Sequence, residues 1–558
     1  MNPIWHPCNP PELAAARTLA QALGLPAALA PLLCRHALSD ANLASAFLHP
    51  RLKSLSDPLL LPDMEKAVAR IFQAIDAGEK IALYGDYDVD GVTSLTMLRR
   101  MLAEYGNAAA CFLPHRVDEG YGLSADGITR CLAEHAPGLL IAVDCGTSSA
   151  REISDLTSNG IDVIVLDHHE CGGEWPVCAA VVNPKRGNEF GYLCSGGLAF
   201  KLCHALLKTR PLPDFDLKSF LDLAALATVA DLVPLIGENR LLVRHGLTRM
   251  QNTSWAGLRA LIEVSGVSFP LNASDIGFRL GPRLNAAGRL GTAQAALDLL
   301  STDDPAEARM LAAELHAQNA ERQTIEKHTH QSAMELVSAP EAPAIVVGAR
   351  GWTPGVVGIV AARLARHFHR PSVVIAFDEN GVGKGSGRSI SGVSLVSALE
   401  KCAPWLEKFG GHEMAAGLTI LESNLTRFTA EFEAAVAMLV DPENLHPKLH
   451  LDCELTLAEI NDALWDAQNH FEPFGMANPR PTYWVRKVNP AREPVVMKEK
   501  HLRMFLADRR TQMAAVFFGG AAAPLPPPPW DVAFHLETNT YRGETSLQLQ
   551  ITHLRTSC

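Results

Sequence analysis

Three short apolar segments, each followed at once by acidic residues, constrain the fold of this chain more than any other feature. They occupy 81–85, 139–143 and 162–166 and are almost entirely apolar. Runs of this length and composition are typical of strands that are buried on both faces of a parallel sheet. Stretches rich in Ala and Leu lie between them and have the character of helices. The sequence therefore predicts an α/β domain built on a parallel sheet.

The residues that follow these strands carry most of the candidate chemistry. The carboxyl ends of parallel strands lie at one edge of a sheet, where ligands bind in open α/β folds. Five Asp and two His are expected at that edge, and an Asp that follows the apolar helical segment 223–230 can join them. The eight residues are Asp86, Asp88, Asp90, Asp144, Asp167, His168, His169 and Asp231.

This concentration of carboxylates predicts a site for divalent cations. Carboxylates that lie close together repel one another, and bound cations are the usual compensation. Oxygen ligands combined with imidazole favour Mn²⁺ or Mg²⁺ over the softer metals that thiolates select. Enough ligands are present for two ions. A two-metal site suits phosphodiester hydrolysis, because the ions hold both the attacking and the leaving oxygen.

Other interpretations of these motifs explain less. The segment 86–91 matches the start of an EF-hand loop, but the twelfth position, which requires Glu, is Met97. A solvated acidic turn accounts for one cluster and not for acids after three strands. An isolated His pair is usually structural, but His168 and His169 directly follow Asp at a strand end. The segment 381–387 has the Lys of an NTPase phosphate-binding loop without its spacing.

The pattern of the chain divides it into five parts. Residues 1–75 predict short helices joined by Pro-containing turns, and 76–300 contain the α/β domain with the acidic site. A long polar helix is predicted within 301–338, a second α/β domain within 339–442, and a small β-barrel within 443–558. The Pro-rich tract inside that barrel must be a loop, because Pro cannot donate to a β-ladder.

Length, charge and cysteine content narrow the class of protein. A chain of 558 residues is too long for one hydrophobic core, so several domains are expected. The net charge of −12 argues weakly against nucleic acid as a partner, although a basic groove can lie on an acidic body. Twelve cysteines without a C-x-x-C pair suit reduced thiols. With no signal peptide or membrane span in the sequence, we expect a soluble, cytoplasmic monomer.

Taken together, the acidic and histidine motifs resemble the DHH family of phosphoesterases. Asp167, His168 and His169 resemble the signature of that family, and 86–91, 143–146 and 227–231 resemble its other motifs in the same order. From about residue 45 onward, further segments resemble the RecJ group of bacterial exonucleases within the family. These segments are 47–64, 115–123, 194–202, 281–291, 351–364, 385–392, 409–417 and 541–551.

The resemblance implies both an architecture and an activity. It predicts a DHH catalytic domain at 76–300, a DHHA1 nucleic-acid-binding domain at 339–442 and an OB-fold domain at 443–558, with the long helix joining the first two. It implies a single-stranded-DNA-specific 5′-to-3′ exonuclease that releases 5′-mononucleotides and acts in DNA repair and recombination. It also implies two Mn²⁺ or Mg²⁺ ions as cofactors, and single-strand-binding protein and a RecQ-type helicase as partners.

The same resemblance assigns roles to the acidic cluster. It implies that Asp144 bridges the two ions, that His169 lies beside the scissile phosphate, and that Asp167 supports the His pair. The implied metal ligands are Asp86, Asp88, Asp90, Asp144, His168 and Asp231. The implied catalytic set is Asp88, Asp90, Asp144, His168, His169 and Asp231.

Gly-rich and basic motifs are the candidates for holding the DNA. Arg, hydroxyl groups and backbone N–H groups are the usual phosphate contacts, and Gly lets the backbone approach closely. The implied nucleic-acid-binding residues are Arg116, Arg289, Ser386, Arg388, Gly411 and His412, with a 5′-phosphate pocket near Arg116, Ser386 and Arg388. An ordinary turn is the alternative for each Gly-rich stretch. Thr353 stands where relatives often carry His, so the local DNA contact can differ there.

Two other functions remain open from the sequence. The first is a phosphodiesterase for short oligoribonucleotides, cyclic dinucleotides or phosphoadenosine phosphate, although such relatives generally lack the N-terminal extension and the barrel. The second is a binding scaffold that has lost catalysis. The complete set of acids and histidines argues against that scaffold.

Overall fold

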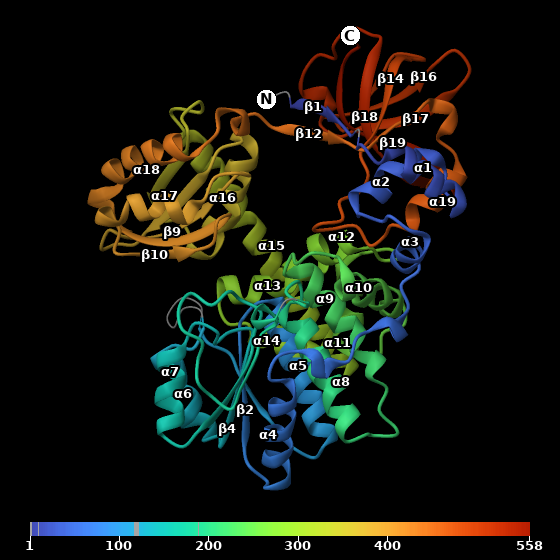
Figure 1. Ribbon diagram of the computed structural model, residues 1–558. Helices are drawn as coiled ribbons and strands as arrows, with labels where there is room; N and C mark the ends of the chain where they lie inside the picture. The colour runs from blue at the N-terminus through green and yellow to red at the C-terminus, as the bar shows by residue number, and fades with distance from the viewer. Residues whose placement is uncertain (1–2, 9, 116–121, 188, 558) are drawn as a thin grey trace. The chain divides into compact units, whose positions relative to one another are not determined.

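The computed structural model, drawn in Figure 1, describes residues 3–8, 10–115, 122–187 and 189–557. By its internal contacts the chain divides into two compact units. The first unit contains Asp57–Asp231 and Gly246–Pro447, and the second contains Ile4–Ser56, Leu232–His245 and Lys448–Cys558. The five parts expected from the sequence are a different and finer division, which stays a prediction. No helix within the described ranges is long and apolar enough to cross a membrane.

A parallel sheet of five strands forms the first half of the first unit, as predicted. The strand order is β3-β2-β4-β5-β6, and every neighbouring pair is parallel. Strands β2 and β4 are buried along their whole length, which is why they are continuously apolar. The bounds are β2 Ile81–Gly85, β3 Ala110–Phe112, β4 Leu139–Val143, β5 Asp162–Leu166 and β6 Ala180–Val182.

Helices α4 to α7 alternate with the strands of this sheet along the chain, and a further run of helices, α8 to α14, follows its last strand. Helix α5 begins directly after the acidic motif because Asp88 caps it, its carboxylate accepting from the N–H groups of Asp90 and Gly91. The helices are α4 Met64–Asp76, α5 Val89–Glu104, α6 Ala125–His135, α7 Ala150–Ser158, α8 Ser195–Thr209, α9 Leu221–Ala230, α10 Gly237–Met250, α11 Ala256–Ser265, α12 Ala273–Asp275, α13 Gly281–Leu290 and α14 Gln294–Ser301.

A 32-residue helix, α15 (Pro305–Leu336), leads to the second sheet of the first unit and matches the predicted long helix. That sheet has the order β10-β11-β9-β8-β7, in which β7 and β8 are parallel and the other pairs antiparallel. Its elements are β7 Ile345–Arg350, α16 Pro354–Phe368, β8 Ser372–Phe377, β9 Val382–Arg388, α17 Leu395–Lys401, β10 Lys408–Gly411, β11 Ala415–Leu421 and α18 Leu425–Leu439. The predicted second α/β layer is therefore confirmed, with a mixed sheet.

The second unit contains the predicted β-barrel. Its strand order is β13-β14-β18-β19-β17-β16-β15, and a further pairing of β14 with β16 closes the sheet on itself. The Pro-rich tract runs as a loop into β18, as expected. The strands are β13 Cys453–Glu454, β14 Tyr483–Pro490, β15 Val495–Met497, β16 His501–Ala507, β17 Gln512–Phe517, β18 Trp530–Tyr541 and β19 Glu544–Thr556.

The N-terminal helices share a hydrophobic core with this barrel. One buried cluster joins Leu29 and Leu33 to Leu464 of α19 and to Tyr483 and Phe534 of the barrel. Strand β1 also pairs in parallel with β12. The remaining elements of the unit are β1 Ile4–Pro7, α1 Leu13–Ala22, α2 Ala30–Arg35, α3 Ala41–Leu48, β12 Lys448–Leu451 and α19 Asp462–Asn469. The sequence predicted the short helices and not their partner.

Candidate metal centre

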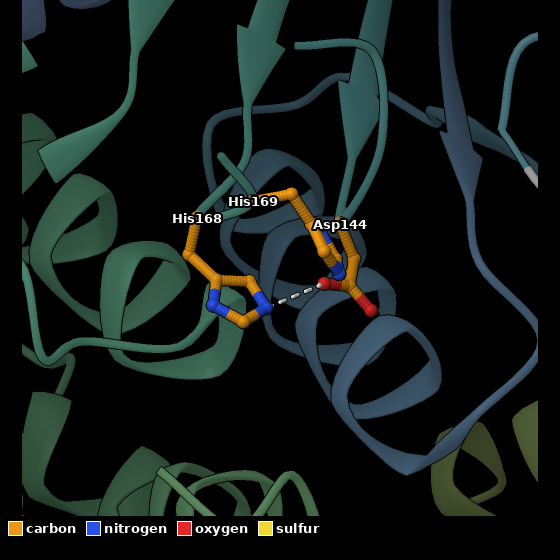
Figure 2. A group of neighbouring side chains, drawn as sticks. All are labelled: Asp144, His168 and His169. Atoms are coloured by element: carbon orange, nitrogen blue, oxygen red, sulfur yellow. Dashed lines mark ion pairs between the residues drawn. The ribbon is translucent and has the colours of Figure 1, made fainter. Parts of the chain in front are cut away.

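The strand ends of the parallel sheet bring the predicted acids and histidines together. Asp86 follows β2, Asp144 follows β4, and His168 and His169 follow β5, while Asp231 ends α9. Figure 2 shows Asp144 with the two histidines, and its dashed line joins His168 Nε2 to Asp144 Oδ1 across 3.4 Å. Because the strands are parallel and adjacent, residues that are far apart along the chain meet at one edge of the sheet.

His168 Nε2 faces carboxylate oxygens from three different elements. It lies 3.4 Å from Asp144 Oδ1, 3.5 Å from Asp231 Oδ2 and 3.7 Å from Asp90 Oδ2. These separations exceed the length of an ordinary hydrogen bond. Nε2 and Asp231 Oδ2 are both buried and have no hydrogen-bond partner among the described residues. Nitrogen and oxygen atoms that converge without hydrogen-bonding to one another are the arrangement expected of ligands to a shared cation.

Three groups of side chains offer ligand atoms that lie within 4.8 Å of one another. His168 and Asp144 each belong to two of them, so the groups form one continuous cluster rather than separate sites. The groups are Asp86 with Asp88 and Asp144, Asp90 with His168 and Asp231, and Asp144 with His168 and His169. All six residues predicted as metal ligands are therefore in place to act as such, and their individual roles remain predictions.

The pKa shifts within the cluster fit a site that binds cations. Burial, together with neighbouring carboxylates, raises the pKa of Asp90 to about 6 and that of Asp231 to about 9, and it raises the pKa of Asp144 well above its ordinary value. Burial and the adjacent His169 lower the pKa of His168 to about 3. A neutral imidazole is the form that binds metal, and bound cations would allow the carboxylates to ionise. The donor set thus fits Mn²⁺ or Mg²⁺.

Asp167 holds the histidine pair through Oδ1 and is itself fixed through Oδ2. Its Oδ1 accepts from the backbone N–H of His168 at 2.7 Å and contacts His169 Nδ1 at 2.7 Å, and its Oδ2 accepts from the N–H of Thr147 at 3.0 Å. Although burial opposes it, the bond to His169 carries the pKa of Asp167 below its usual range. Burial lowers the pKa of His169, but the bond to Asp167 raises it above 6.5. This geometry suits a supporting role for Asp167.

Backbone geometry around the cluster depends on a few special positions. Asp144 has a positive φ of 63°, an uncommon conformation for a residue other than Gly, and its N–H donates to Leu166 O at 2.9 Å. Strain of this kind is typical of functional sites. Gly91 is needed for space, because a Cβ there would lie 2.4 Å from the carbonyl oxygen of Asp86. The Gly of the acidic motif therefore has a packing reason of its own.

Sequence reasoning missed three polar residues that contact the cluster or the segments that carry it. Asn183, fully buried, donates from Nδ2 to Thr147 Oγ1 at 2.8 Å and to His169 O at 3.0 Å. Asn285 accepts from the N–H of Val89 at 3.1 Å. Ser195 contacts two of the carboxylates. Only the last two lie in segments that had been singled out by resemblance, and no local pattern marks Asn183.

Five of the six residues predicted to contact DNA lie among the described residues. Arg116 lies outside the described residues. Arg388 NH1 donates to Ser386 Oγ at 2.9 Å, so these two predicted residues form a pair on β9. A Cβ at Gly358 of α16 would lie 3.0 Å from that Oγ and 3.2 Å from Arg388 NH2, which places the Gly beside the pair.

The other residues predicted to contact DNA are Arg289, Gly411 and His412. Arg289 NH1 donates to Gly355 O at 3.2 Å. Gly411 ends β10 with a φ of 141°, and the N–H of His412 donates to Ala415 O at 2.8 Å. Thr353 precedes α16 and makes no capping bond within the part of the chain that is described. The DNA-binding roles of all these residues stay predictions.

Comparison with known protein families places three domains along the chain. The DHH family, N-terminal domain, matches residues 80–228, the DHHA1 domain matches 341–438 and the RecJ OB domain matches 451–553. A single-stranded-DNA-specific exonuclease RecJ of Escherichia coli is 34% identical over 573 residues, which cover 96% of this chain and 98% of that protein. The chain belongs to the RecJ family.

Other RecJ proteins agree over most of the chain. RecJ of Thermus thermophilus is 37% identical over 90% of this chain and 73% of its own length. RecJ of Bacillus subtilis is 37% identical over 91% of this chain, which spans 65% of that protein's length. The crystal structure of Thermus RecJ in complex with Mn²⁺ has a TM-score of 0.87 and 33% identity, covering 99% of this chain and 79% of that one. The complex with Mg²⁺ gives 0.82 and 31%, covering 99% and 78%.

Proposed function

We propose that this RecJ family member is a single-stranded-DNA-specific 5′-to-3′ exonuclease that releases 5′-mononucleotides by two-metal hydrolysis. The observation that carries the proposal is the convergence of His168 Nε2 with oxygens of Asp90, Asp144 and Asp231, buried and beyond ordinary hydrogen-bond length. Relatives named single-stranded-DNA-specific exonuclease match over nearly the whole chain, barrel included, which favours a polymer over a small substrate.

The cluster divides naturally into ligands for two ions. Asp86, Asp88 and Asp144 would hold one ion, and Asp90, His168 and Asp231 the other, with Asp144 close enough to both groups to serve them together. Bound Mn²⁺ or Mg²⁺ supplies positive charge to the phosphate and lowers the pKa of water. The protein contributes fixed oxygen and nitrogen atoms in a largely water-excluded setting, where electrostatic interactions are strong.

His169 is the side chain best placed to act on the substrate directly. Asp167 holds its Nδ1, which fixes the plane of the ring and favours the protonated form. In that form the Nε2 proton can be donated to a phosphate oxygen. We therefore assign to His169 the orientation of the scissile phosphate and the stabilisation of negative charge that develops there.

The finer parts of the proposal rest on family resemblance. Arg116, Arg289, Ser386, Arg388, Gly411 and His412 would hold the strand, with the 5′-phosphate near Arg116, Ser386 and Arg388. Single-strand-binding protein, a RecQ-type helicase, a role in repair and a cytoplasmic location are proposed on the same basis. We also propose the five-part domain division of the chain.

A labelling experiment tests the activity. The protein with Mn²⁺ is given single-stranded DNA labelled at the 5′ or the 3′ end, beside matched duplex and an RNA dinucleotide, with a chelator in a parallel set. Early release of labelled mononucleotide from the 5′ end of the single strand, abolished by the chelator, is the expected result. Survival of the single strand while the dinucleotide is cleaved would instead establish a small-substrate phosphodiesterase.

A further inference from the structure

The first residues of helix α8 donate hydrogen bonds to two of the buried carboxylates, Asp90 and Asp144. The N–H groups of Ser195 and Gly196 donate to Asp90 Oδ2 at 2.8 Å and Asp90 Oδ1 at 2.7 Å. The hydroxyl of Ser195 donates to Asp144 Oδ1 at 2.8 Å. Asp90 Oδ2 and Asp144 Oδ1 are the same oxygens that face His168 Nε2. Ser195 thus touches both carboxylates on the side of the cluster that His168 occupies.

Close packing makes this contact possible. A Cβ at Gly196 would lie 2.3 Å from the Cβ of Ala227 on α9 and 3.1 Å from Asp90 Oδ1. The helix can approach Asp90 only because residue 196 has no side chain. Ser195 itself is fully buried, so its hydroxyl does not contact bulk water. These contacts give a physical reason for the Ser195-Gly196 pair at the start of α8.

These hydrogen bonds act on metal ligands without replacing them. A carboxylate oxygen has two lone pairs, so an oxygen that accepts one N–H or O–H can still bind a cation. The N-terminus of a helix also carries partial positive charge, which favours the ionised form of a nearby carboxylate. Outer hydrogen bonds of this kind orient metal ligands and affect metal affinity.

We infer that Ser195 is a positioning residue for the metal centre, its hydroxyl fixing the orientation of Asp144 while the first turn of α8 fixes Asp90. This inference rests on the proposed metal-dependent function. It predicts that Ser195 determines how tightly the ions bind and has little effect on turnover once they are bound.

The test compares Ser195→Ala with Ser94→Ala. Ser94 is also a buried serine, on α5, and its hydroxyl has no hydrogen-bond partner in the described part of the chain, so the same atom is removed without touching a carboxylate. Mn²⁺ binding is measured without DNA by electron paramagnetic resonance, and the melting temperature is measured in chelator. Exonuclease rate is then followed against Mn²⁺ concentration.

Ser195→Ala should weaken Mn²⁺ binding by roughly 10- to 100-fold. Its rate should recover to near that of the unmodified protein at saturating Mn²⁺, while Ser94→Ala binds normally. Unchanged Mn²⁺ affinity in Ser195→Ala would overturn the inference. If the unmodified protein binds Mn²⁺ but leaves single-stranded DNA intact, the proposed function fails and the binding comparison still decides the role of Ser195.

A second variant separates the hydrogen bond from packing. Ser195→Thr keeps a hydroxyl and adds a methyl group, so its Mn²⁺ affinity should stay closer to that of the unmodified protein than the affinity of Ser195→Ala, even where its melting temperature falls. Equal weakening in both variants would mean that packing and not the hydroxyl matters, and it would also overturn the inference.

Discussion

At the scale of single residues, Asp144 is the position on which most of the cluster depends. It offers an oxygen to two of the three ligand groups and faces His168. Asp144→Asn keeps the shape and removes the charge, so it should lower kcat/KM on single-stranded DNA by at least about 100-fold, since a metal's charge stabilisation is worth several kcal/mol. A single-strand degradation assay measures this loss, and a Mn²⁺ titration measures the change in metal binding.

A matched Asp→Asn change provides the control. Asp162 lies at the amino end of β5, at the opposite end of that strand from Asp167 and the histidines, and it pairs with Arg70. Loss of this exposed ion pair should cost no more than about 1 kcal/mol and leave Mn²⁺ binding unchanged. Similar losses of activity in both variants would contradict the assignment of Asp144.

Asp231 gives a prediction for the effect of pH on stability. Its folded-state pKa is raised from 3.8 to about 9, so between these values the metal-free folded state binds more protons than the unfolded state. Below pH 3.8 the Asp231 carboxyl is protonated in both states and its burial costs no folding stability. As pH rises from 3.8 toward 9, the unfolded state loses this proton first, so the free energy of unfolding falls. In chelator, Asp231→Asn should therefore melt above the unmodified protein by a margin that grows from about pH 5 to about pH 9. A difference in melting temperature that is constant or shrinks over that range would show that the pKa of Asp231 is not raised in the folded state.

At the scale of elements, Arg240 shows how the first part of α10, residues 237–245, is fixed inside the second unit. The guanidinium is 2% exposed and donates to Phe47 O, His470 O and Phe471 O at 3.1, 2.9 and 2.7 Å. Lys lacks the planar fork, so Arg240→Lys should leave buried carbonyl groups unsatisfied and destabilise this unit by about 2–5 kcal/mol. Denaturant unfolding, followed by hydrogen exchange at 470–472, measures the loss.

The control for this change is Arg309→Lys, on the exposed side of α15. It should alter the unfolding free energy by less than about 0.5 kcal/mol, as surface substitutions usually do. If Arg240→Lys proved equally mild, the three hydrogen bonds could not be what holds α10.

At the scale of the whole molecule, the second unit is assembled from three separate stretches of chain. Leu29 and Leu33 are buried against residues of α19 and the barrel. Removal of residues 448–558 should therefore expose the apolar faces of α1 and α2 and open 4–56 to proteolysis. Limited digestion with mass spectrometry should find cuts in that segment only in the truncated protein. A protected N-terminal segment would show that it folds alone.

What the sequence could predict follows from how local each signal is. Acids directly after apolar strands, as at Asp86, Asp144 and Asp167, identified the parallel sheet and the cluster, because strand ends meet wherever parallel strands pair. The long helix and the barrel also have local periodicity. Ser195 and Asn183 were missed because their importance lies in contacts with residues far away in the sequence. The N-terminal helices were predicted correctly, but nothing in their own pattern names the barrel as their partner.

The discontinuous second unit has a consequence for synthesis on the ribosome. About 390 residues separate Ser56 from Lys448, so at roughly 5–20 residues per second the N-terminal helices emerge roughly 20–80 s before their barrel. During that interval their apolar faces have no native surface to cover. The nascent chain is then a natural client for chaperones that hold apolar segments, and slow translation or low temperature should make the yield of native protein depend on them.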